Sequence, residues 1–328
     1  MTTKYNYVLC FDGLYAAAYS ELYQLSEVCL LHIWPQNKFM FNLYRLQHSN
    51  TINSMIRMPF KSIWYPYNCK DIIFEDTSKP ICFVFLTNLF EYDYNREFIS
   101  YLRKKYPNCK IVGYYTDLIR APWRHYTGNI DKIRPLVDLL VNYDKREADE
   151  FGMVYQPTSF GNILFEHDPS IADCDVYYLG AEKIDRHRKL LNLYEQFTHA
   201  GLKCEFYISN VPKEKQKNLP GMHYIKPQSM SYIRNLQHVD HTRCILELMQ
   251  ENAVGYTMRL WESINYGKAL ITDNQSLEYT QFYDNNYVSF LQEGYANVDF
   301  VRNYKPYNNP LKNLIKPIRL IENLESNL

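Results

Sequence analysis

One stretch of the chain decides the expected fold: Asn252-Ala-Val-Gly255-Tyr-Thr257-Met-Arg259-Leu-Trp-Glu262-Ser-Ile-Asn-Tyr-Gly267-Lys-Ala-Leu-Ile-Thr-Asp273. It predicts a loop of small residues, then a short helix, then a buried strand. The start of a helix binds anions, because its first N–H groups lack partners within the helix and the helix dipole is positive there. Arg259 lies near that start and Glu262 follows one turn later. The stretch therefore predicts a site for a nucleotide sugar, with pyrophosphate at the helix start and ribose beside the glutamate.

The same order of elements recurs outward from this stretch. Short apolar runs alternate with helical patterns, which predicts β-α units and parallel sheets. In the first half we expect strands at 5–11, 71–75, 81–86, 110–115 and 136–142, and helices at 16–33, 43–58, 94–106 and 145–151. In the second half we expect strands at 175–180, 203–208, 223–225, 244–248, 269–272 and 287–291, and helices at 186–200, 229–238 and 257–266. The expected fold class is α/β, with two doubly wound, Rossmann-like domains.

The chain is long for a single hydrophobic core. Its 328 residues suggest two domains of about 150 residues each. We expect a first domain over 1–155, a linker over 156–174, a second domain over 175–310 and a C-terminal helix over 311–328. Ligands of such sheets bind at the carboxyl ends of the strands. We therefore expect the two domains to face each other across a ligand-binding cleft.

Composition argues against several classes of protein. The 36 basic and 36 acidic residues cancel, so the chain has no overall positive field for nucleic acid. The eight cysteines form no C-x-x-C pair and most lie in apolar runs, which is typical of reduced thiols in a cytosolic protein. The first residues lack the apolar core of a signal peptide, and no apolar run has the length of a membrane span. We expect a cytoplasmic protein that does not bind nucleic acid.

The roles of Arg259 and Glu262 have a simpler alternative. Two such residues three positions apart can form a surface ion pair, worth only about 0.2–0.5 kcal/mol. The small-residue loop and the expected N-cap at Thr257 favour a ligand site instead. In that site Arg259 binds phosphate and Glu262 accepts from ribose hydroxyls. The backbone N–H groups of Gly255, Tyr256 and Thr257 bind the pyrophosphate.

A second candidate segment follows the first expected strand of the second half: Gly180-Ala-Glu-Lys183-Ile-Asp-Arg186. A glycine there lets the backbone approach a ligand, and Lys183 and Arg186 are suited to neutralise a diphosphate. The segment does not match the G-x-G-x-x-G fingerprint of dinucleotide sites. The alternative is a solvated loop that leads into a helix capped by Asp185.

Three segments resemble bacterial glycosyltransferases of the GT-B architecture, in particular those of lipopolysaccharide, capsule and exopolysaccharide biosynthesis. They are Val141-Asn-Tyr-Asp144-Lys-Arg-Glu-Ala-Asp-Glu-Phe-Gly152-Met-Val-Tyr155, Asp175-Val-Tyr-Tyr-Leu-Gly180-Ala-Glu-Lys183-Ile-Asp-Arg186, and Ile245-Leu-Glu247 through Asn274. The third resembles the group's donor-site signature. The likeness covers the part of the chain after residue 140. The sequence departs from the group at Ala253, where glutamine is usual, and at Tyr256, where leucine is usual.

The resemblance implies an enzyme that moves a sugar from a nucleoside diphosphate to a surface polysaccharide or its lipid-linked precursor. It implies a donor site on the second domain, an acceptor site on the first, and no metal or other cofactor. In the sequence, Asp240-His241 is an isolated pair, and no histidine has carboxylates at metal-ligand spacing. An inverting enzyme needs a base for the acceptor hydroxyl. Asp12 and Asp117, each after a first-domain strand, are the candidates; a retaining enzyme would need neither.

One further segment is unusual in charge. No aspartate or glutamate occurs from Val28 to Lys70, whereas basic and aromatic residues are frequent there. Such a composition suits the headgroup region of an anionic membrane, and a lipid-linked acceptor would agree with it. We expect membrane-surface contact through residues 34–67, at the inner face of the cell membrane. The alternative is that most of these aromatic residues belong to the core.

Two other functions fit the same expected fold. A nucleotide-sugar epimerase of this architecture would need no acceptor. A non-catalytic partner subunit of a transferase complex would need no nucleotide. We keep both as alternatives to the transferase.

Overall fold

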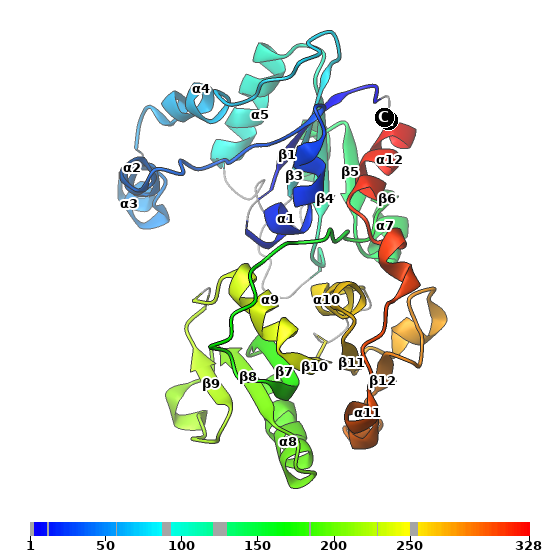
Figure 1. Ribbon diagram of the computed structural model, residues 1–328. Helices are drawn as coiled ribbons and strands as arrows, with labels where there is room; N and C mark the ends of the chain where they lie inside the picture. Colours follow the sequence, from blue (N-terminus) through cyan, green and yellow to red (C-terminus); the bar gives the residue numbers. More distant parts are fainter. Residues whose placement is uncertain are drawn as a thin grey trace. The chain divides into compact units, whose positions relative to one another are not determined.

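The computed structural model describes residues 3–11, 13–56, 58–86, 93–120, 130–183, 185–227, 229–249 and 255–328, and it divides into two compact units (Figure 1). Unit 1 contains Met1–Gly161 and Pro317–Leu328, and unit 2 contains Asn162–Lys316. Each unit is built on one six-stranded sheet. Among the described residues, no helix combines the length and the apolar character that crossing a bilayer requires.

The sheet of unit 1 has the order β2-β1-β3-β4-β5-β6, with parallel pairing throughout. Its strands are β1 (Asn6–Cys10), β2 (Val28–Leu30), β3 (Ile81–Leu86), β4 (Lys110–Tyr115), β5 (Leu139–Asn142) and β6 (Val154–Tyr155). Its helices are α1 (Gly13–Ala18), α2 (Lys38–Gln47), α3 (Asn50–Met55), α4 (Trp64–Asn68), α5 (Asp93–Lys105), α6 (Ile130–Ile133), α7 (Lys145–Phe151) and α12 (Ile318–Asn327). The terminal helix α12 packs into this unit, because the Tyr7 hydroxyl donates to Glu325 at 2.7 Å and Asn323 donates to the Tyr155 carbonyl at 3.0 Å.

The sheet of unit 2 has the order β12-β11-β10-β7-β8-β9, again entirely parallel. Its strands are β7 (Cys174–Ala181), β8 (Cys204–Ser209), β9 (Met222–Ile225), β10 (Thr242–Glu247), β11 (Ala269–Thr272) and β12 (Val288–Phe290). Its helices are α8 (Arg186–His199), α9 (Tyr232–Asp240), α10 (Met258–Tyr266) and α11 (Val298–Asn303). The predicted fold class, α/β with two doubly wound parallel sheets and a C-terminal helix, is confirmed.

Successive residues of β7 show that both faces of this sheet are covered. Tyr178 belongs to the apolar core that also contains Phe197 of α8 and Val301 of α11. Its neighbour Tyr177 points the other way and donates its hydroxyl to Asn235 of α9 at 3.0 Å. Neighbouring side chains of a strand point to opposite faces, so α8 and α11 lie on one face and α9 on the other. Burial on both faces explains why the strands are almost continuous apolar runs.

Three expectations for the first half are wrong. The helix expected over 16–33 is α1, a 3₁₀ turn at Ser20–Gln24 and then β2, because parallel pairing with β1 holds β2 extended. Residues 71–75, all described, form no strand; β1 is paired with β2 on one side and with β3 on the other. The helix expected over 43–58 is divided into α2 and α3, because Ser49 caps a second helix by accepting from Ile52 N–H at 3.4 Å.

Helix caps explain where several helices begin. Asp144 caps α7 and accepts from the N–H groups of Arg146 and Glu147 at 3.0 and 3.1 Å. Asp185, expected to cap α8, has a left-handed backbone and its side chain makes no capping bond. The carboxylate of Glu182 accepts from His187 N–H at 2.7 Å instead. Asp185 thus occupies the N-cap position, as expected, but the His187 N–H is satisfied by a side chain five residues earlier.

Candidate functional site

The strand order of unit 2 marks one position as the expected ligand site. Starting at β7, the chain adds β8 and β9 on one side and then β10, β11 and β12 on the other. The connections after β7 and β10 therefore diverge at the carboxyl ends of two adjacent strands. Open parallel sheets bind their ligands at such a switch point. The helix that follows β10 is α10, the helix of the stretch quoted first.

The start of α10 is fixed by Thr257. Its side-chain oxygen accepts from Arg259 N–H at 3.1 Å, so it is the N-cap that the sequence predicted. The helix ends at Gly267, whose φ of 61° is the left-handed conformation of a C-cap glycine. Between these caps Leu260, Trp261 and Ile264 are fully buried. The helix is therefore anchored by its apolar face at the predicted position.

A buried carboxylate holds this helix start against the sheet. Glu247, the last residue of β10, is 1% exposed and accepts from the hydroxyls of Thr257 and, at 2.5 Å, Thr272. Burial raises the pKa of Glu247, while these two hydroxyls and Arg259 act in the opposite direction. The carboxylate thus links the end of β10, the end of β11 and the start of α10. Removing it would leave the protons of these two hydroxyls without an acceptor, at a cost of about 1–3 kcal/mol each.

The loop before α10 is held from the other side by Asn274. Its side chain donates to the Gly255 carbonyl at 3.1 Å, and its own N–H donates to Thr272 Oγ1 at 2.9 Å. Tyr256 packs against the rings of Trp261 and Phe282. Gly255, Tyr256 and Thr257 are therefore placed at the helix start as predicted. Residues 252–254 of the same loop lie outside the described residues.

Arg259 connects α10 with the end of β7. Its Nη2 donates to the Leu179 carbonyl, and the guanidinium lies 5.9 Å from the centre of the Tyr178 ring. The side chain is half-buried, so it does not project freely into solvent. The fold thus brings Arg259 beside Gly180, which is 79 positions earlier in the sequence. The two separate segments predicted to bind a diphosphate are neighbours.

Glu262 faces inward, one turn after Arg259. It is 4% exposed, and its Oε1 accepts from Tyr232 Oη at 2.8 Å and from Asn235 Nδ2 at 2.9 Å. No described residue donates to its Oε2, and within the described part of the chain it forms no ion pair with Arg259. Burial raises the pKa of Glu262 even though Arg259 acts to lower it. The surface ion pair considered from the sequence is therefore not what the structure contains.

The loop after β7 contains the other predicted donor residues. Arg186 is buried, and its Nη1 donates to the Ala181 carbonyl at 2.8 Å. The Lys183 carbonyl accepts from Arg186 N–H at 2.9 Å, which forms the turn into α8. The guanidinium of Arg186 thus braces the loop from within. This contact favours a positioning role for Arg186 over direct binding of phosphate.

Position 180 must be a glycine, because the side chain of Tyr178 fills the space that a Cβ would occupy. A Cβ at position 180 would overlap Tyr178 Oη and lie only 2.8 Å from Tyr178 Cζ. We therefore expect Gly180→Ala to lower the free energy of unfolding of unit 2 by about 1–3 kcal/mol, as for other overpacked sites. Tyr178→Phe should be nearly neutral, because this buried hydroxyl has no partner among the described residues.

The double variant tests this explanation. Tyr178→Phe removes the atom that a new Cβ would overlap most, so it should recover part of the stability lost in Gly180→Ala. Urea unfolding of the two single variants and of the double variant measures the coupling between the sites. Strict additivity, or wild-type stability of Gly180→Ala, would contradict the steric explanation.

The two candidate bases lie in unit 1. Asp12 lies outside the described residues. Asp117 follows β4, is half-buried, and its Oδ1 accepts from the N–H of Leu118 at 2.9 Å. This contact is local and is compatible with either a turn residue or a base. Both residues remain predictions.

The fold assembles one cluster that the sequence did not indicate. His167, Asp240 and His241 each offer a ligand atom, and these atoms lie within 4.8 Å of one another. The interpretation of Asp240-His241 as an isolated pair is therefore wrong, because His167 comes from a distant segment. The sequence contained no spacing signal for it.

Other supporting residues were also missed. Tyr232 and Asn235 hold Glu262 from α9, and Glu247 and Asn274 hold the start of α10. One signal was available for Glu247: a carboxylate that ends a buried apolar strand is unusual and needs partners. The contacts made by α9 had no counterpart in the sequence pattern.

Comparisons with known proteins give only distant likenesses. No family model and no curated protein matches this chain. Similar solved structures include an α-glucosyltransferase in complex with UDP-glucose and DNA containing an abasic site (12% identity, 98% of this chain and 92% of that chain, TM-score 0.46). They also include a UDP-forming α,α-trehalose-phosphate synthase from Burkholderia xenovorans (8%, 98% and 96%, 0.46) and the glycosyltransferase SnogD from Streptomyces nogalater (11%, 97% and 94%, 0.40). At such low identities and TM-scores, their donors and acceptors are not transferred to this chain.

Proposed function

We propose that this protein is a glycosyltransferase that takes its sugar from a nucleoside diphosphate bound to unit 2. The observation that carries the proposal is the placement of Arg259 and Glu262 on α10, at the switch point of the sheet. Arg259 contacts the end of β7 beside Gly180, and Glu262 keeps Oε2 without a donor among the described residues. In the proposed complex the diphosphate lies at the start of α10 and the ribose hydroxyls donate to Glu262.

The reaction breaks one bond and forms another. The bond between the anomeric carbon and the diphosphate oxygen breaks, and the acceptor oxygen forms a new bond to that carbon. The acceptor proton goes to a base in an inverting enzyme, for which Asp12 and Asp117 are the candidates. Negative charge that develops on the leaving diphosphate is stabilised by Arg259, Lys183 and the N–H groups at the start of α10. The proposal assigns no step to a metal ion.

Nucleotide binding is the direct test. A thermal-shift panel of UDP, GDP, CDP and dTDP should show stabilisation by at least one nucleotide, by about 2.7 kcal/mol at a hundred times its dissociation constant. A non-catalytic partner subunit would show no response to any of the four. An epimerase would release altered sugar without an acceptor, whereas a transferase should release none until a glycan is added.

We further propose that the acceptor is a surface glycan or its lipid-linked precursor and that unit 1 contacts a membrane surface. Large apolar side chains are exposed within the segment free of acidic residues: Phe39 (69%), Met55 (80%), Ile56 (70%) and Phe60 (76%). Lys38 and Arg45 are exposed on α2, the helix that also contains Phe39. By contrast, Tyr44, Trp64 and Tyr65 are buried. The alternative, that the aromatic residues of this segment belong to the core, therefore holds for only part of the segment.

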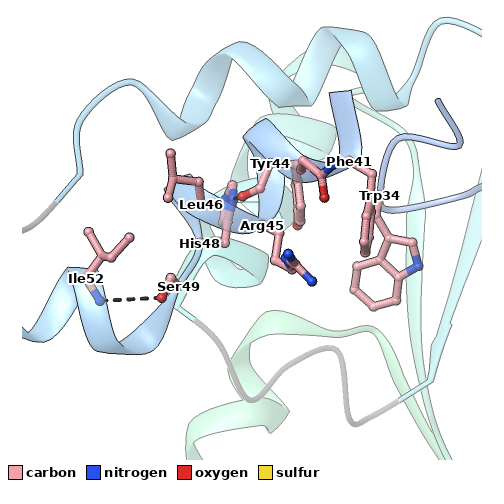
Figure 2. Close-up of a pocket in the computed structure, with 9 residues that line it drawn as sticks. Trp34, Phe41, Tyr44, Arg45, Leu46, His48, Ser49 and Ile52 are labelled. Carbon is pink, nitrogen blue, oxygen red and sulfur yellow. Dashed lines mark hydrogen bonds between the residues drawn. The ribbon is translucent and has the colours of Figure 1, made fainter. Parts of the chain in front are cut away.

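A cavity of about 560 Å³ lies against α2 and α3 (Figure 2). Trp34, Phe41, Tyr44 and Arg45 are among the residues that line it. It combines aromatic walls, which can pack against a sugar ring or an apolar chain, with a cationic group that can bind a phosphate. This supports a lipid-linked acceptor or an anionic lipid at unit 1.

Vesicle binding tests the membrane contact. The protein should bind phosphatidylglycerol vesicles more tightly than phosphatidylcholine vesicles, and added salt should weaken the binding. Phe39→Ser combined with Phe60→Ser should lower the affinity by at least about tenfold, because each phenylalanine contributes about 1.5–3 kcal/mol when buried. Tyr279→Ser is the control, since Tyr279 is 87% exposed in unit 2. Equal binding of all three proteins would contradict the assignment.

A further inference from the structure

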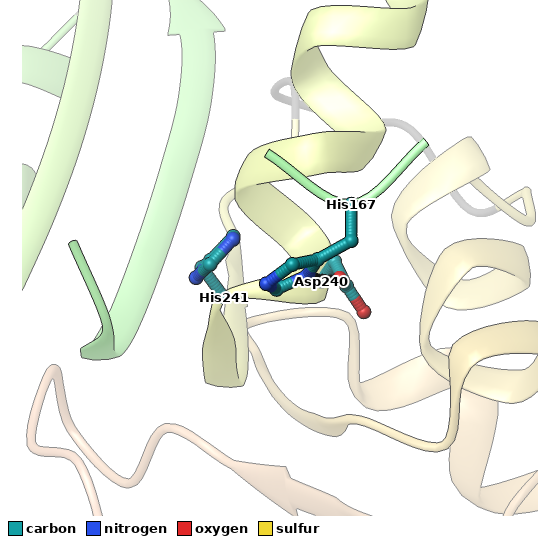
Figure 3. A group of neighbouring side chains, drawn as sticks. All are labelled: His167, Asp240 and His241. Atoms are coloured by element: carbon teal, nitrogen blue, oxygen red, sulfur yellow. Dashed lines mark hydrogen bonds and ion pairs between the residues drawn. The ribbon is translucent and has the colours of Figure 1, made fainter. Parts of the chain in front are cut away.

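The cluster of His167, Asp240 and His241 (Figure 3) lies at the edge of the unit 2 sheet opposite to the start of α10. Asp240 is the last residue of α9, and His241 directly precedes β10. All strands of this sheet are parallel, so the amino end of β10 lies at the edge opposite to its carboxyl end, where α10 begins. His167 comes from the segment that leads into β7. The cluster is therefore separate from the proposed donor site.

His241 has the environment of a metal ligand. Its side chain is 6% exposed, its Nδ1 lies 2.8 Å from Asp173 Oδ1, and its Nε2 is buried without a partner among the described residues. If Nδ1 donates to the carboxylate, Nε2 carries a lone pair and no proton. Leaving such a buried atom unpaired is costly. A carboxylate on one ring nitrogen and a metal on the other is the usual arrangement of metal-bound histidines.

The other two residues complete a ligand set. His167 Nδ1 lies 2.7 Å from Asp240 Oδ2, and the rings of His167 and His241 stack with centres 4.4 Å apart. The ring of His167 is 63% exposed, so it can turn without disturbing the core. A cavity of about 410 Å³, lined by Asp173, Asp240 and His241 among others, gives access to the cluster. Two imidazoles and a carboxylate are the donors that zinc and similar divalent ions prefer.

The surrounding charges also allow a cation. Asp173 and Asp175 add carboxylates to the lining of the cavity. Its two cationic side chains are Lys203 and Arg243, and Arg243 lies 3.4 Å from Asp175. The Lys268 ammonium donates to the Asp240 backbone carbonyl at 2.8 Å, not to the carboxylate. The Asp240 carboxylate is thus left to His167 and to a metal.

We infer that His167, Asp240 and His241 bind a divalent transition-metal ion such as zinc, with Asp173 orienting His241. The ion fastens the segment before β7 to the turn between α9 and β10. Its fourth position is open to water. The role is to stabilise unit 2, at a distance from the sugar-transfer chemistry.

Calorimetric titration of the full chain with Zn²⁺ tests this inference. We expect one ion per chain, no comparable binding of Mg²⁺, and a higher midpoint of thermal unfolding with Zn²⁺. His167→Ala should weaken Zn²⁺ binding by at least about tenfold, and Asp173→Asn should weaken it by about 10–100-fold as an outer partner. Both side chains are largely exposed, at 63% and 91%, so both variants should remain folded.

Two controls distinguish binding at this site from binding at cysteine thiols or at other histidines. His199→Ala removes an exposed histidine of α8 and should leave Zn²⁺ binding unchanged. Co²⁺ should give the absorption of a nitrogen and oxygen site, whereas a strong thiolate charge-transfer band would place the metal on cysteine and overturn the inference. Equal Zn²⁺ affinity of the wild type and His167→Ala would overturn it as well. Loss of nucleotide binding in Arg259→Ala would not affect either result.

Discussion

Arg259→Ala is expected to lower kcat/KM for sugar transfer by about 10²–10³-fold, the usual loss when one donor to developing charge is removed. In the structure the Arg259 guanidinium lies at the end of β7, beside Gly180 and above the Tyr178 ring. There it can add a fixed positive charge to the N–H groups at the start of α10. Alanine keeps the helix and its Thr257 cap but removes that charge. The nucleotide-dependent thermal shift should shrink in parallel.

Two further variants make this result specific. Arg259→Lys retains the charge but loses the planar fork, so its activity should lie between those of the wild type and the alanine variant. Arg243→Ala is the matched control, because Arg243 lies on the same unit, near the amino end of β10, and pairs with Asp175. If Arg259→Ala and Arg243→Ala have equal kcat/KM and equal nucleotide response, Arg259 does not contact the donor.

The sequence predicted unit 2 better than unit 1 for a physical reason. In unit 2, β7, β10 and β11 each contain a compact apolar run, and α10 carries its own start and stop signals in Thr257 and Gly267. In unit 1, β2 exists because it pairs with β1, and its three residues follow a segment with helical periodicity. Pairing between distant segments overrides local propensity. No window of sequence around Val28 contains that information.

In the candidate site, too, some features follow from local sequence and others depend on distant segments. Arg259, Glu262 and Gly180 were predicted because each follows a strand or begins a helix, and such positions can be recognised locally. The contacts that hold them come from elsewhere: Glu247 from the strand before, Asn235 from α9, and Leu179 from the first strand of the unit. Which side chain fills the space around a functional residue depends on tertiary packing. The metal cluster is the extreme case, since His167 lies 73 positions before Asp240.

Buried acids and a buried histidine give unit 2 opposing responses to pH. Burial raises the pKa of Glu247 and of Glu262, so the folded state holds their protons more tightly than the unfolded state does. Their contribution to stability is present at low pH and is lost as pH rises through the folded pKa. His238 has the opposite sign, because burial lowers its pKa. The contribution of His238 can be separated from that of the two glutamates by comparing the wild type with a variant that changes His238 alone.

We expect the free energy of unfolding of the wild type to fall by about 3 kcal/mol between about pH 7 and pH 4 because of His238, and we expect His238→Phe not to show this fall. His238 is 8% exposed and its ring stacks on Tyr177 at 5.5 Å and against Tyr207 at 4.9 Å. Burial lowers its pKa from 6.5 to about 4, with Arg234 acting in the same direction. Between these values the unfolded chain binds the proton and the folded chain does not, so unfolding is favoured as pH falls.

Phenylalanine keeps a flat ring between the two tyrosines but has no proton to bind. The free energy of unfolding from urea titrations should therefore fall less steeply with decreasing pH in His238→Phe than in the wild type. The contributions of Glu247 and Glu262 are common to both proteins and cancel in the difference. His199→Phe serves as the control, because His199 is exposed and its replacement should leave the slope unchanged. Parallel curves for the wild type and His238→Phe would show that His238 takes up its proton over the same pH range in the folded and unfolded states, and its packing against Tyr177 would then have to tolerate a charge.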